Sequence, residues 1–417
     1  MKAWIHSKRI PYLTKLMIII LILCLAGAAN GNSPEGFASV SALGLNGTSG
    51  GEGGNVVTVT NATDFVNYAW DTNPLIIQVA DTIELTAMVA INSNKTIVGI
   101  GDQGVINGGG FHINSQSNII IRNLLFQNSS DDAINVQESS HHIWIDHCDF
   151  TNAYDGLVDI KRGSDYITVS WNKFYDHHKT CLLGHSDNNG AQDSTHLLVS
   201  YHHNWFSGTL SRHPRVRFSG LTHVYNNYYT DNGYGIASTM DAKVLVEGNY
   251  FYLVDDPTLV GYGSSDPGDL VEQNNVFDNC TNAPQTRGTV PSPPYAYQLD
   301  DPASIPTIVP ANAGRVGFMT GIKDHAEIVA NLYELQQNYP NPFNPATTIE
   351  YSLAKPGNVR LSVFNMLGQE VLRLADGYKG PGTHEVLVDA GQLSSGIYIY
   401  SLQVGGYSQS KKMILLK

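Results

Sequence analysis

The chain has 417 residues, enough for one large core and an appended domain, and only 15% of them are charged. Its 40 glycines and 10% aromatic residues are typical of an extracellular β-rich protein and disfavour a helical cytosolic one. The formal net charge of −13 argues against a nucleic-acid partner. It would also repel an anionic polysaccharide unless a local basic patch or a bound cation reversed the field.

The N-terminal segment predicts a cleaved signal peptide. Residues 1–15 contain four basic side chains and no acidic one, residues 16–25 are apolar, and residues 26–28 are small. The apolar run is too short to span a bilayer comfortably, and no other run is long enough. We therefore expect residues 1–29 to be removed, which leaves a mature chain with a net charge of −17 and no transmembrane segment.

From about residue 117 the sequence repeats a short β-branched run that ends at an aromatic residue. Successive aromatic positions are 24, 24, 32, 23, 22 and 26 residues apart. A period in the twenties with one strand-like run per unit is typical of a solenoid, and the leucine pattern of leucine-rich repeats is missing. We therefore predict an all-β fold, a right-handed parallel β-helix with coils ~4.8 Å apart. The aromatic positions are Phe126, Phe150, Phe174, Phe206, Tyr229, Phe251 and Phe277.

Asparagines stand two positions before five of these aromatic residues. Because equivalent positions stack in a β-helix, we predict an inward asparagine ladder that satisfies backbone groups at the turns and has no catalytic role. The ladder positions are Asn172, Asn204, Asn227, Asn249 and Asn275.

Three cysteines remain after removal of the signal peptide, namely Cys148, Cys181 and Cys280. An odd number does not describe a disulfide framework. Buried free thiols are therefore expected, while a bridge between Cys148 and Cys181 stays open.

The composition changes near residue 332 and predicts a second domain. After a start rich in Pro and Asn, strand-like segments alternate with Gly and Pro turns, which is typical of a small β-sandwich. We therefore predict a β-helix domain over residues 30–330, in which residues 252–330 pack as loops, and a β-sandwich domain over residues 331–417. Its expected strands are residues 347–353, 358–365, 384–390, 396–404 and 411–417.

The aromatic positions give a register, and this register predicts that several charged side chains lie on one strip of the β-helix. Side chains five or six residues past successive aromatic positions should lie one above another on consecutive coils, and these are Asp132, Asp155, Lys179 and Arg212. Asp159 follows Asp155 by four residues and shares its face in an extended strand. Any one Asp is more often a solvated turn residue. Three carboxylates in register beside basic side chains instead predict a site for a hard cation, Ca²⁺ above all.

The sequence also offers residues for a zinc site and for a glycosidic hydrolase site. Adjacent histidines alternate faces in a strand and no CxxC or HExxH motif accompanies them, which argues against zinc. Asp131 and Asp132 fit the paired acids of a glycosidic hydrolase. A hydrolase, however, gains nothing obvious from Arg212, Arg215 and Arg217, whereas guanidinium groups bind uronate carboxylates bidentately. The histidine pairs are His141 and His142, His177 and His178, and His202 and His203.

Several segments resemble the pectate lyases of polysaccharide lyase family 1. They form an ordered series over roughly residues 90–280: DDAINV (131–136), HIWIDHCDF (142–150), DGLVDIKRGSDYITVSWNKF (155–174), DHHKTCLLGHSD (176–187) and RHPRVRF (212–218). The C-terminal region, from NYPNPFNP to the basic and apolar tail, resembles a type IX secretion sorting domain.

The resemblance implies a calcium-dependent pectate lyase that cleaves α-1,4-linked polygalacturonate by β-elimination to 4,5-unsaturated oligogalacturonates. It implies that the calcium ligands are Asp132, Asp155 and Asp159. It also implies that Arg212 is the base and that Lys179 and Arg217 bind substrate carboxylates. A position that is acidic in some members, two before Asp132, is Ser130 here.

The same resemblance predicts the cellular setting. We expect a monomer that is secreted by, or displayed on, a Gram-negative bacterium and engages the type IX secretion machinery through residues 331–417. Three alternatives stay open, namely a calcium-independent pectin lyase, a polygalacturonase-type hydrolase and a non-catalytic β-helix that binds pectin. The three acids and Lys179 argue against the first, and the full set of site residues argues against the last.

Overall fold

The computed structural model describes residues 33–315, 333–353, 357–366, 369–380, 382–404 and 407–417. The predicted signal peptide, residues 1–29, lies outside these ranges. Within them, no helix is long and apolar enough to cross a membrane.

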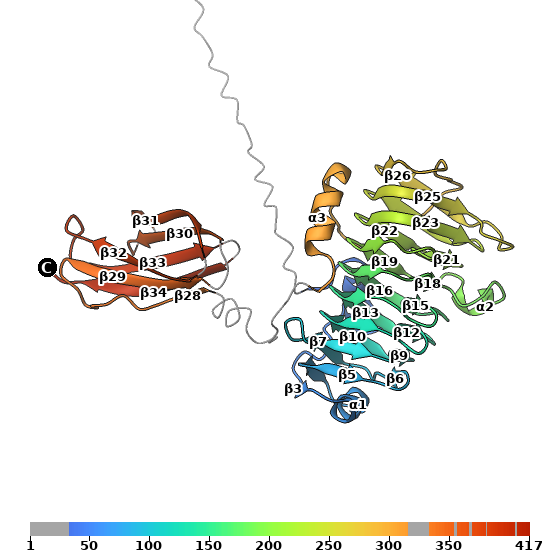
Figure 1. The fold of residues 1–417 in the computed structure, drawn as a ribbon, viewed down its shortest axis with the longest axis horizontal. Coiled ribbons are helices and arrows are strands. Elements are labelled where there is room, and N and C mark those ends of the chain that lie inside the picture. Colours follow the sequence, from blue (N-terminus) through green and yellow to red (C-terminus); the bar gives the residue numbers. More distant parts are fainter. Residues whose placement is uncertain (1–32, 316–332, 354–356, 367–368, 381, 405–406) are drawn as a thin grey trace, which may run out of the picture. The chain divides into compact units, whose positions relative to one another are not determined.

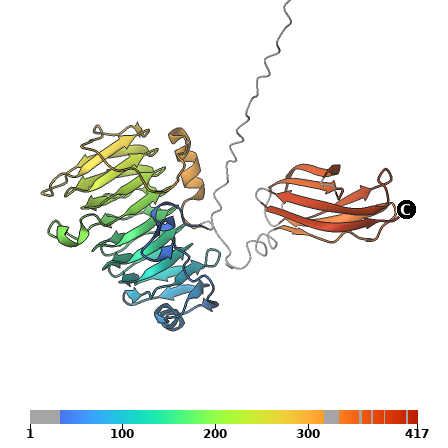
Figure 2. The ribbon, with the colours of Figure 1, turned by 180° about the vertical axis from the view of Figure 1, so that it is seen from behind.

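Residues 55–278 form a parallel β-helix, as the sequence predicted, and its stacked coils are seen from both sides in Figures 1 and 2. One face is a ten-stranded parallel sheet. Its strands are β3 (Asn55–Val59), β4 (Leu75–Val79), β7 (Lys95–Gly99), β10 (Ser117–Arg122), β13 (His141–Asp146), β16 (Asp165–Ser170), β19 (Val199–His202), β22 (Thr222–Tyr225), β24 (Lys243–Glu247) and β26 (Asp269–Gln273).

Two further faces belong to one fifteen-stranded sheet, because the long strand β23 (Tyr228–Thr239) pairs with both. The second face comprises β5 (Thr82–Glu84), β8 (Val105–Asn107), β11 (Leu125–Gln127), β14 (Asp149–Phe150), β17 (Lys173–Tyr175), β20 (Trp205–Ser207), β25 (Tyr250–Val260) and β27 (Val276–Asp278). The third comprises β6 (Val89–Ala90), β9 (Phe111–Asn114), β12 (Ile134–Gln137), β15 (Val158–Ile160), β18 (Leu182–Leu183) and β21 (Arg215–Arg217).

The repeated aromatic residues set the register between coils. Each pairs with the next along the second face, and from Phe126 to Phe277 the successive rings stack with centroids 4.4–5.1 Å apart. The rings lie inside the β-helix with the aliphatic side chains of the three faces. Offset stacking adds to the free energy gained by burial, so one aromatic residue per coil fixes the next coil in place.

The predicted asparagine ladder is confirmed. From Asn172 to Asn275, each side-chain amide nitrogen donates to the side-chain oxygen of the next, at 2.9–3.1 Å. The same nitrogens also donate to backbone carbonyls, as Asn204 does to Val169. Cys148 and Cys181 are buried free thiols, so the bridge that the sequence left open does not form.

Two helices cover parts of the β-helix. Helix α1 (Ala62–Trp70) begins at Asn61, whose side chain accepts the N–H of Asp64, and it buries Phe65 against Phe111 at the N-terminal end. Helix α3 (Ile305–Asn312) buries Ile305 and Val309. The prediction of loops over residues 252–330 is therefore wrong for α3 and for the part of β25 beyond Phe251, whereas β26 and β27 match the strand-like run that was predicted to end at Phe277.

The C-terminal region is a small β-sandwich, as predicted. One antiparallel sheet contains β28 (Tyr333–Leu335), β29 (Ala346–Leu353) and β32 (Gly382–Asp389). The other contains β30 (Gly357–Phe364), β31 (Glu370–Lys379), β33 (Gly396–Val404) and β34 (Tyr407–Leu415). Both sheets contribute to one buried cluster, with Tyr351 from the first and Tyr400 from the second. Strand β31 was not predicted, because register shifts against β30 break its alternation.

Candidate functional site

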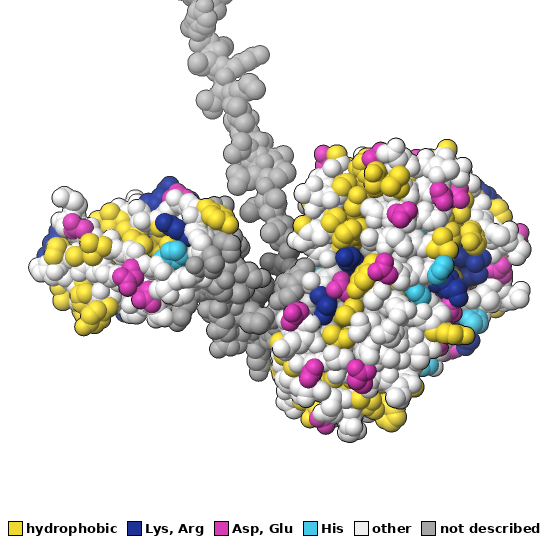
Figure 3. Space-filling view, viewed as in Figure 1, with side chains coloured by type: hydrophobic (Ala, Val, Ile, Leu, Met, Phe, Trp, Pro, Cys, Tyr) yellow, Lys and Arg dark blue, Asp and Glu magenta, His cyan; other side chains and the backbone are white. Residues whose placement is uncertain are grey.

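The third face and the turns leading into it carry the predicted site residues. Asp132 precedes β12, Asp155 and Asp159 flank the start of β15, Lys179 precedes β18 and Arg212 precedes β21. Figure 3 shows Lys, Arg and His side chains gathered on the side of the β-helix from which α2 (Gly190–Asp193) projects in Figure 1. The rigid parallel ladder therefore presents acids and bases from consecutive coils on one surface.

Burial dominates the electrostatics of two carboxylates. The side chains of Asp132 and Asp159 are 4% and 2% exposed, whereas that of Asp155 is 39% exposed. Burial raises the pKa of Asp132, and burial together with the charge of Asp132 raises the pKa of Asp159 to about 8. Burial also acts to raise the pKa of Asp155, but the hydrogen bond from Lys179 and the charge of Arg212 hold it below its ordinary value. A positive charge beyond those of the nearby basic side chains would let all three stay ionised.

Gly156 allows two of these carboxylates to approach each other. A Cβ atom there would lie 2.2 Å from Asp159 Oδ1 and 3.0 Å from Asp132 Oδ1. The Gly156 N–H donates to Asp132 Oδ1 at 2.8 Å, and the Leu182 N–H donates to Asp159 Oδ1 at 3.1 Å. Backbone N–H groups therefore hold the two carboxylates close to Gly156. Any side chain at that position would displace them.

Three cations face the carboxylates. Arg212 Nη1 lies 3.7 Å from Asp155 Oδ1 and 3.6 Å from Asp159 Oδ2, and it bridges the two acids. Lys179 Nζ lies 2.7 Å from Asp155 Oδ1.

The third cation, Lys161, was not predicted from the sequence. Its Nζ lies 3.6 Å from Asp132 Oδ2. The available signal was its spacing, since a residue two past Asp159 in one strand shares the face of Asp159. The site therefore places three acidic side chains beside three basic ones.

The structure brings Asp132, Asp155, Lys179 and Arg212 together, but the predicted register is one residue out for two of them. The ladder runs at an offset of 24 from Ile134 to Val158, which places Asp132 beside Gly156 and not beside Asp155. Lys179 pairs with Ser211, so Arg212 lies beside Thr180. Arg212 still reaches the acids because its side chain is long.

Arg217 has a different partner from the other basic residues. Its side chain is 10% exposed and its Nε lies 2.6 Å from Asp187 Oδ1. The structure therefore places Arg217 on the same face as Arg212, but pairs it with an acid that the sequence analysis did not consider.

The side chains suit a hard cation in their chemistry. Asp132, Asp155 and Asp159 offer carboxylate oxygens only, and burial raises the pKa of Asp132 and Asp159 despite the basic side chains nearby. In the described ranges, no three acidic, histidine or cysteine side chains form a ready-made metal cage. The carboxylates turn toward Lys161, Lys179 and Arg212 instead. A bound calcium ion would therefore take over the role of these ion pairs.

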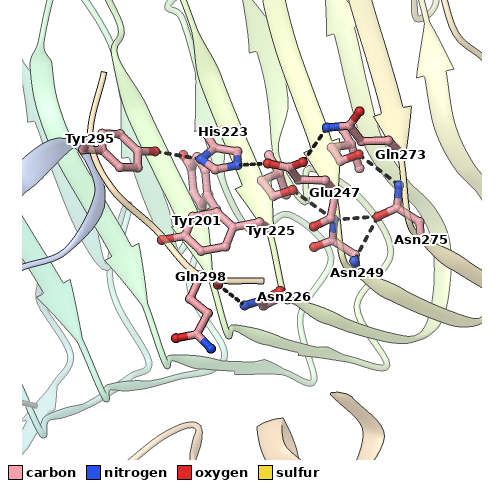
Figure 4. A network of polar contacts seen from close by, with 12 residues as sticks. Tyr201, His223, Tyr225, Asn226, Glu247, Asn249, Gln273, Asn275, Tyr295 and Gln298 are labelled. Carbon is pink, nitrogen blue, oxygen red and sulfur yellow. Dashed lines mark hydrogen bonds and ion pairs between the residues drawn. The ribbon is translucent and has the colours of Figure 1, made fainter. Parts of the chain in front are cut away.

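The histidines of the β-helix have other partners. His202 and His203 share a contact between their Nδ1 atoms at 3.0 Å, and His203 pairs with Asp300. His223 lies between the Tyr295 hydroxyl at 2.8 Å and Glu247 at 2.9 Å, in the polar network of Figure 4. These contacts fasten the segment containing Tyr295 and Asp300 to the ten-stranded face.

Comparison with known proteins gives the same picture for both domains. Residues 10–300 match the family model described as "Pectate lyase", and residues 337–416 match the model described as "Secretion system C-terminal sorting domain".

Curated relatives match most of the chain. The chain is 39% identical over 305 residues to a pectate trisaccharide-lyase of Bacillus licheniformis, covering 68% of this chain and 86% of the relative. It is 39% identical over 358 residues to a pectate trisaccharide-lyase of Thermotoga maritima, covering 73% and 95%. Pectate lyase A of Emericella nidulans is 40% identical over 295 residues, covering 68% and 87%.

A solved structure has the same fold. The crystal structure of a Bacillus pectate lyase in complex with trigalacturonate superposes with a TM-score of 0.62 at 34% identity. The superposition covers 68% of this chain and 98% of that one.

Proposed function

Because the chain belongs to the pectate lyase family, we propose that it is a calcium-dependent lyase that cleaves α-1,4-linked polygalacturonate by β-elimination. The products are 4,5-unsaturated oligogalacturonates. One observation carries the proposal most strongly, namely the position of Arg212 between the carboxylates of Asp155 and Asp159. A base beside acids that suit a hard cation meets the needs of proton removal next to a carboxylate.

The roles follow from the charges of the site. Asp132, Asp155 and Asp159 hold the calcium ion, and Lys179 and Arg217 bind uronate carboxylates. When bound, the ion supplies positive charge to a substrate carboxylate and so makes the neighbouring C5 proton more acidic.

Arg212 performs the proton transfer in this proposal. The guanidinium first gives one proton to solvent, and its neutral form then takes the proton from C5. The electron pair of the broken C5–H bond forms the C4–C5 double bond, and the bond from C4 to the glycosidic oxygen breaks. Solvent supplies the proton that the leaving oxygen needs. The Gly156 N–H keeps Asp132 in place throughout.

We propose that segments at the two ends of the chain direct its export. We propose a signal peptide over residues 1–29, a catalytic domain over 30–330 and a sorting domain over 331–417. The match of residues 337–416 to a secretion sorting model supports secretion or cell-surface display. The finer proposals are a Gram-negative host, the type IX secretion machinery as partner, and a monomeric enzyme.

The test measures ultraviolet absorbance of unsaturated uronate on polygalacturonate, with added CaCl₂ and separately with excess EDTA. We expect a rise that EDTA abolishes and that added CaCl₂ restores. A rise indifferent to EDTA would favour a pectin lyase acting without calcium. New reducing ends without absorbance would mean a hydrolase, and neither signal would mean a β-helix that only binds pectin.

A further inference from the structure

Asp187 makes the closest contact of the Arg217 guanidinium. Its Oδ1 accepts the Nε–H at 2.6 Å, and the Gly184 carbonyl accepts a bond from Nη1 at 3.3 Å. These two contacts use the Nε edge and one Nη hydrogen, and they leave three of the five N–H groups of the guanidinium for a ligand. Arg217 is therefore held in one orientation before any substrate arrives.

The second oxygen of Asp187 reaches another arginine through a serine. Ser265 donates its hydroxyl to Asp187 Oδ2 at 2.7 Å, and Arg215 Nη2 donates to the same hydroxyl oxygen at 2.7 Å. The Arg215 guanidinium also lies 4.8 Å from the ring centroid of Tyr262. One carboxylate thus organises two arginines of strand β21.

The charges of this cluster do not balance. Arg215 and Arg217 are close enough that the charge of Arg217, added to the effect of burial, lowers the pKa of Arg215. Asp187 supplies a single negative charge to the pair. A further anion is therefore attracted to the two guanidinium groups, and a uronate carboxylate has the planar shape that they bind.

The segment that carries Asp187 is anchored without Asp187. The buried Asp193 accepts the N–H groups of Gly163 at 2.9 Å and His185 at 3.1 Å, as well as the side-chain amide of Asn189 at 2.8 Å. At the start of the segment, Gly184 lets the backbone pass close to Arg217, since a Cβ atom there would lie 2.9 Å from the Arg217 carbonyl oxygen. A change at Asp187 should therefore alter the arginines and leave the segment in place.

We propose that Asp187 is a positioning residue, which orients Arg217 directly and Arg215 through Ser265 so that the two arginines receive one uronate carboxylate of the substrate. The inference rests on the proposed function and adds Arg215 and Ser265 to the binding surface. Asp187 acts through the arginines and does not touch the substrate. Its contribution falls on substrate binding, because the carboxylate that the arginines hold is present before and after the proton leaves.

The test compares the wild type with Asp187→Asn, Arg217→Ala and the double variant on polygalacturonate. We expect Asp187→Asn to raise KM about tenfold while kcat changes much less, as for lost uniform binding. In the Arg217→Ala background the same substitution should raise KM less than about twofold, because its main partner is gone. The matched control is Glu138→Gln, which removes the charge beside Arg162 and one of the two oxygens that accept from Arg162 and from Gln192 of the same segment, and it should leave KM unchanged.

Two results would overturn the inference. A lower KM in Asp187→Asn would mean that Asp187 competes with the substrate for Arg217. An equal rise in KM with and without Arg217 would mean that Asp187 only supports the fold. Calorimetric binding of trigalacturonate should rank the variants in the same order. If the wild type gave no ultraviolet signal, the proposed lyase reaction would be wrong. The order of the trigalacturonate affinities would still decide whether Asp187 positions the arginines.

Discussion

Each charged side chain at the site lies next to groups of the opposite charge. Arg212 lies between two carboxylates and is 18% exposed, so its guanidinium is fixed by ion pairs and yet reachable from solvent. Burial and the charge of Asp132 raise the pKa of Asp159 to about 8 even though Arg212 and Lys161 act to lower it. Asp159 therefore needs a further positive charge to stay ionised at neutral pH.

Arg212→Lys should reduce kcat by about a hundredfold or more, because the shorter, single-point ammonium cannot reach the substrate proton from the same backbone position. The positive charge beside Asp155 and Asp159 remains, so unfolding temperature and calcium affinity should change little. The measurement is ultraviolet absorbance of unsaturated product at saturating substrate. A kcat like that of the wild type would remove Arg212 from the role of base.

Asp155→Ala should raise the calcium concentration needed for half-maximal activity by about tenfold or more, since one of three charged oxygen ligands is lost. Asp131→Ala is the matched control. Asp131 is exposed, and its backbone carbonyl accepts the Asp155 N–H, a contact that the substitution keeps. Calcium titration of activity measures both variants. Equal titration curves for Asp155→Ala and the wild type would exclude Asp155 from the ligand set.

Histidine burial should make the protein sensitive to acid. His213 is fully buried between Thr209 and the Tyr234 carbonyl, and burial lowers its pKa from 6.5 to about 4. As the pH falls through this window, the unfolded chain binds a proton that the folded protein does not. Stability is therefore lost, by about 3 kcal/mol from this one residue.

His213→Asn should lower stability near neutral pH, where packing is lost, yet reduce the further loss on acidification by about 3 kcal/mol. Chemical unfolding at about pH 7 and about pH 4 gives both quantities. The exposed His178→Asn is the control and should leave the acid sensitivity unchanged. A loss in His213→Asn as steep as in the wild type would mean that other groups cause it.

At the scale of elements, the asparagine ladder joins five coils by one chain of hydrogen bonds. Asn227 in its middle donates to Asn249 and to the carbonyls of Tyr201 and Tyr225, and its oxygen accepts from Asn204. All these groups are buried, so each lost partner leaves an unsatisfied polar group.

Asn227→Ala should therefore destabilise the β-helix by about 3 kcal/mol or more, because several buried donors and acceptors lose their partners together. Asn275→Ala, at the half-buried end of the ladder, should cost about 1 kcal/mol, since water replaces part of what is lost. Urea unfolding measures both. Equal losses at the two positions would show that the ladder contributes position by position and not as a connected chain.

The periodic part of the fold was predictable, and the irregular part was not. One aromatic residue per coil gave the β-helix and the ladder, because each coil repeats the same side-chain environment. The site register was off by one residue at Asp132 and Arg212, because the offset between aromatic positions persists into the site, so that residues five and six past the aromatic position are neighbours and do not stack. Asp187 was missed because its segment is an insertion, which lengthens that coil to 32 residues.

At the scale of the whole molecule, two separate cores divide the chain. The buried cluster of the β-helix runs from Val59 to Leu270, and that of the β-sandwich runs from Leu335 to Leu415. Among the residues that the structure describes, none belongs to both clusters. Each domain therefore buries its own apolar surface, which is the main requirement for folding without the other.

Removal of residues 331–417 should consequently leave kcat and KM on polygalacturonate within about twofold of the full chain, while export from the producing cell is lost. A point variant that unfolds the β-sandwich tests whether export needs the folded domain and not only the presence of its residues. Tyr400 is fully buried, donates its hydroxyl to the Gln336 carbonyl at 2.8 Å and accepts the Asn338 N–H at 2.8 Å. Tyr400→Ala should destabilise the β-sandwich by about 3–5 kcal/mol and reduce export, with kcat unchanged. Activity of purified protein and its distribution between cells and medium measure the two effects. A catalytic defect in either variant would mean that the β-helix needs the β-sandwich for its own site.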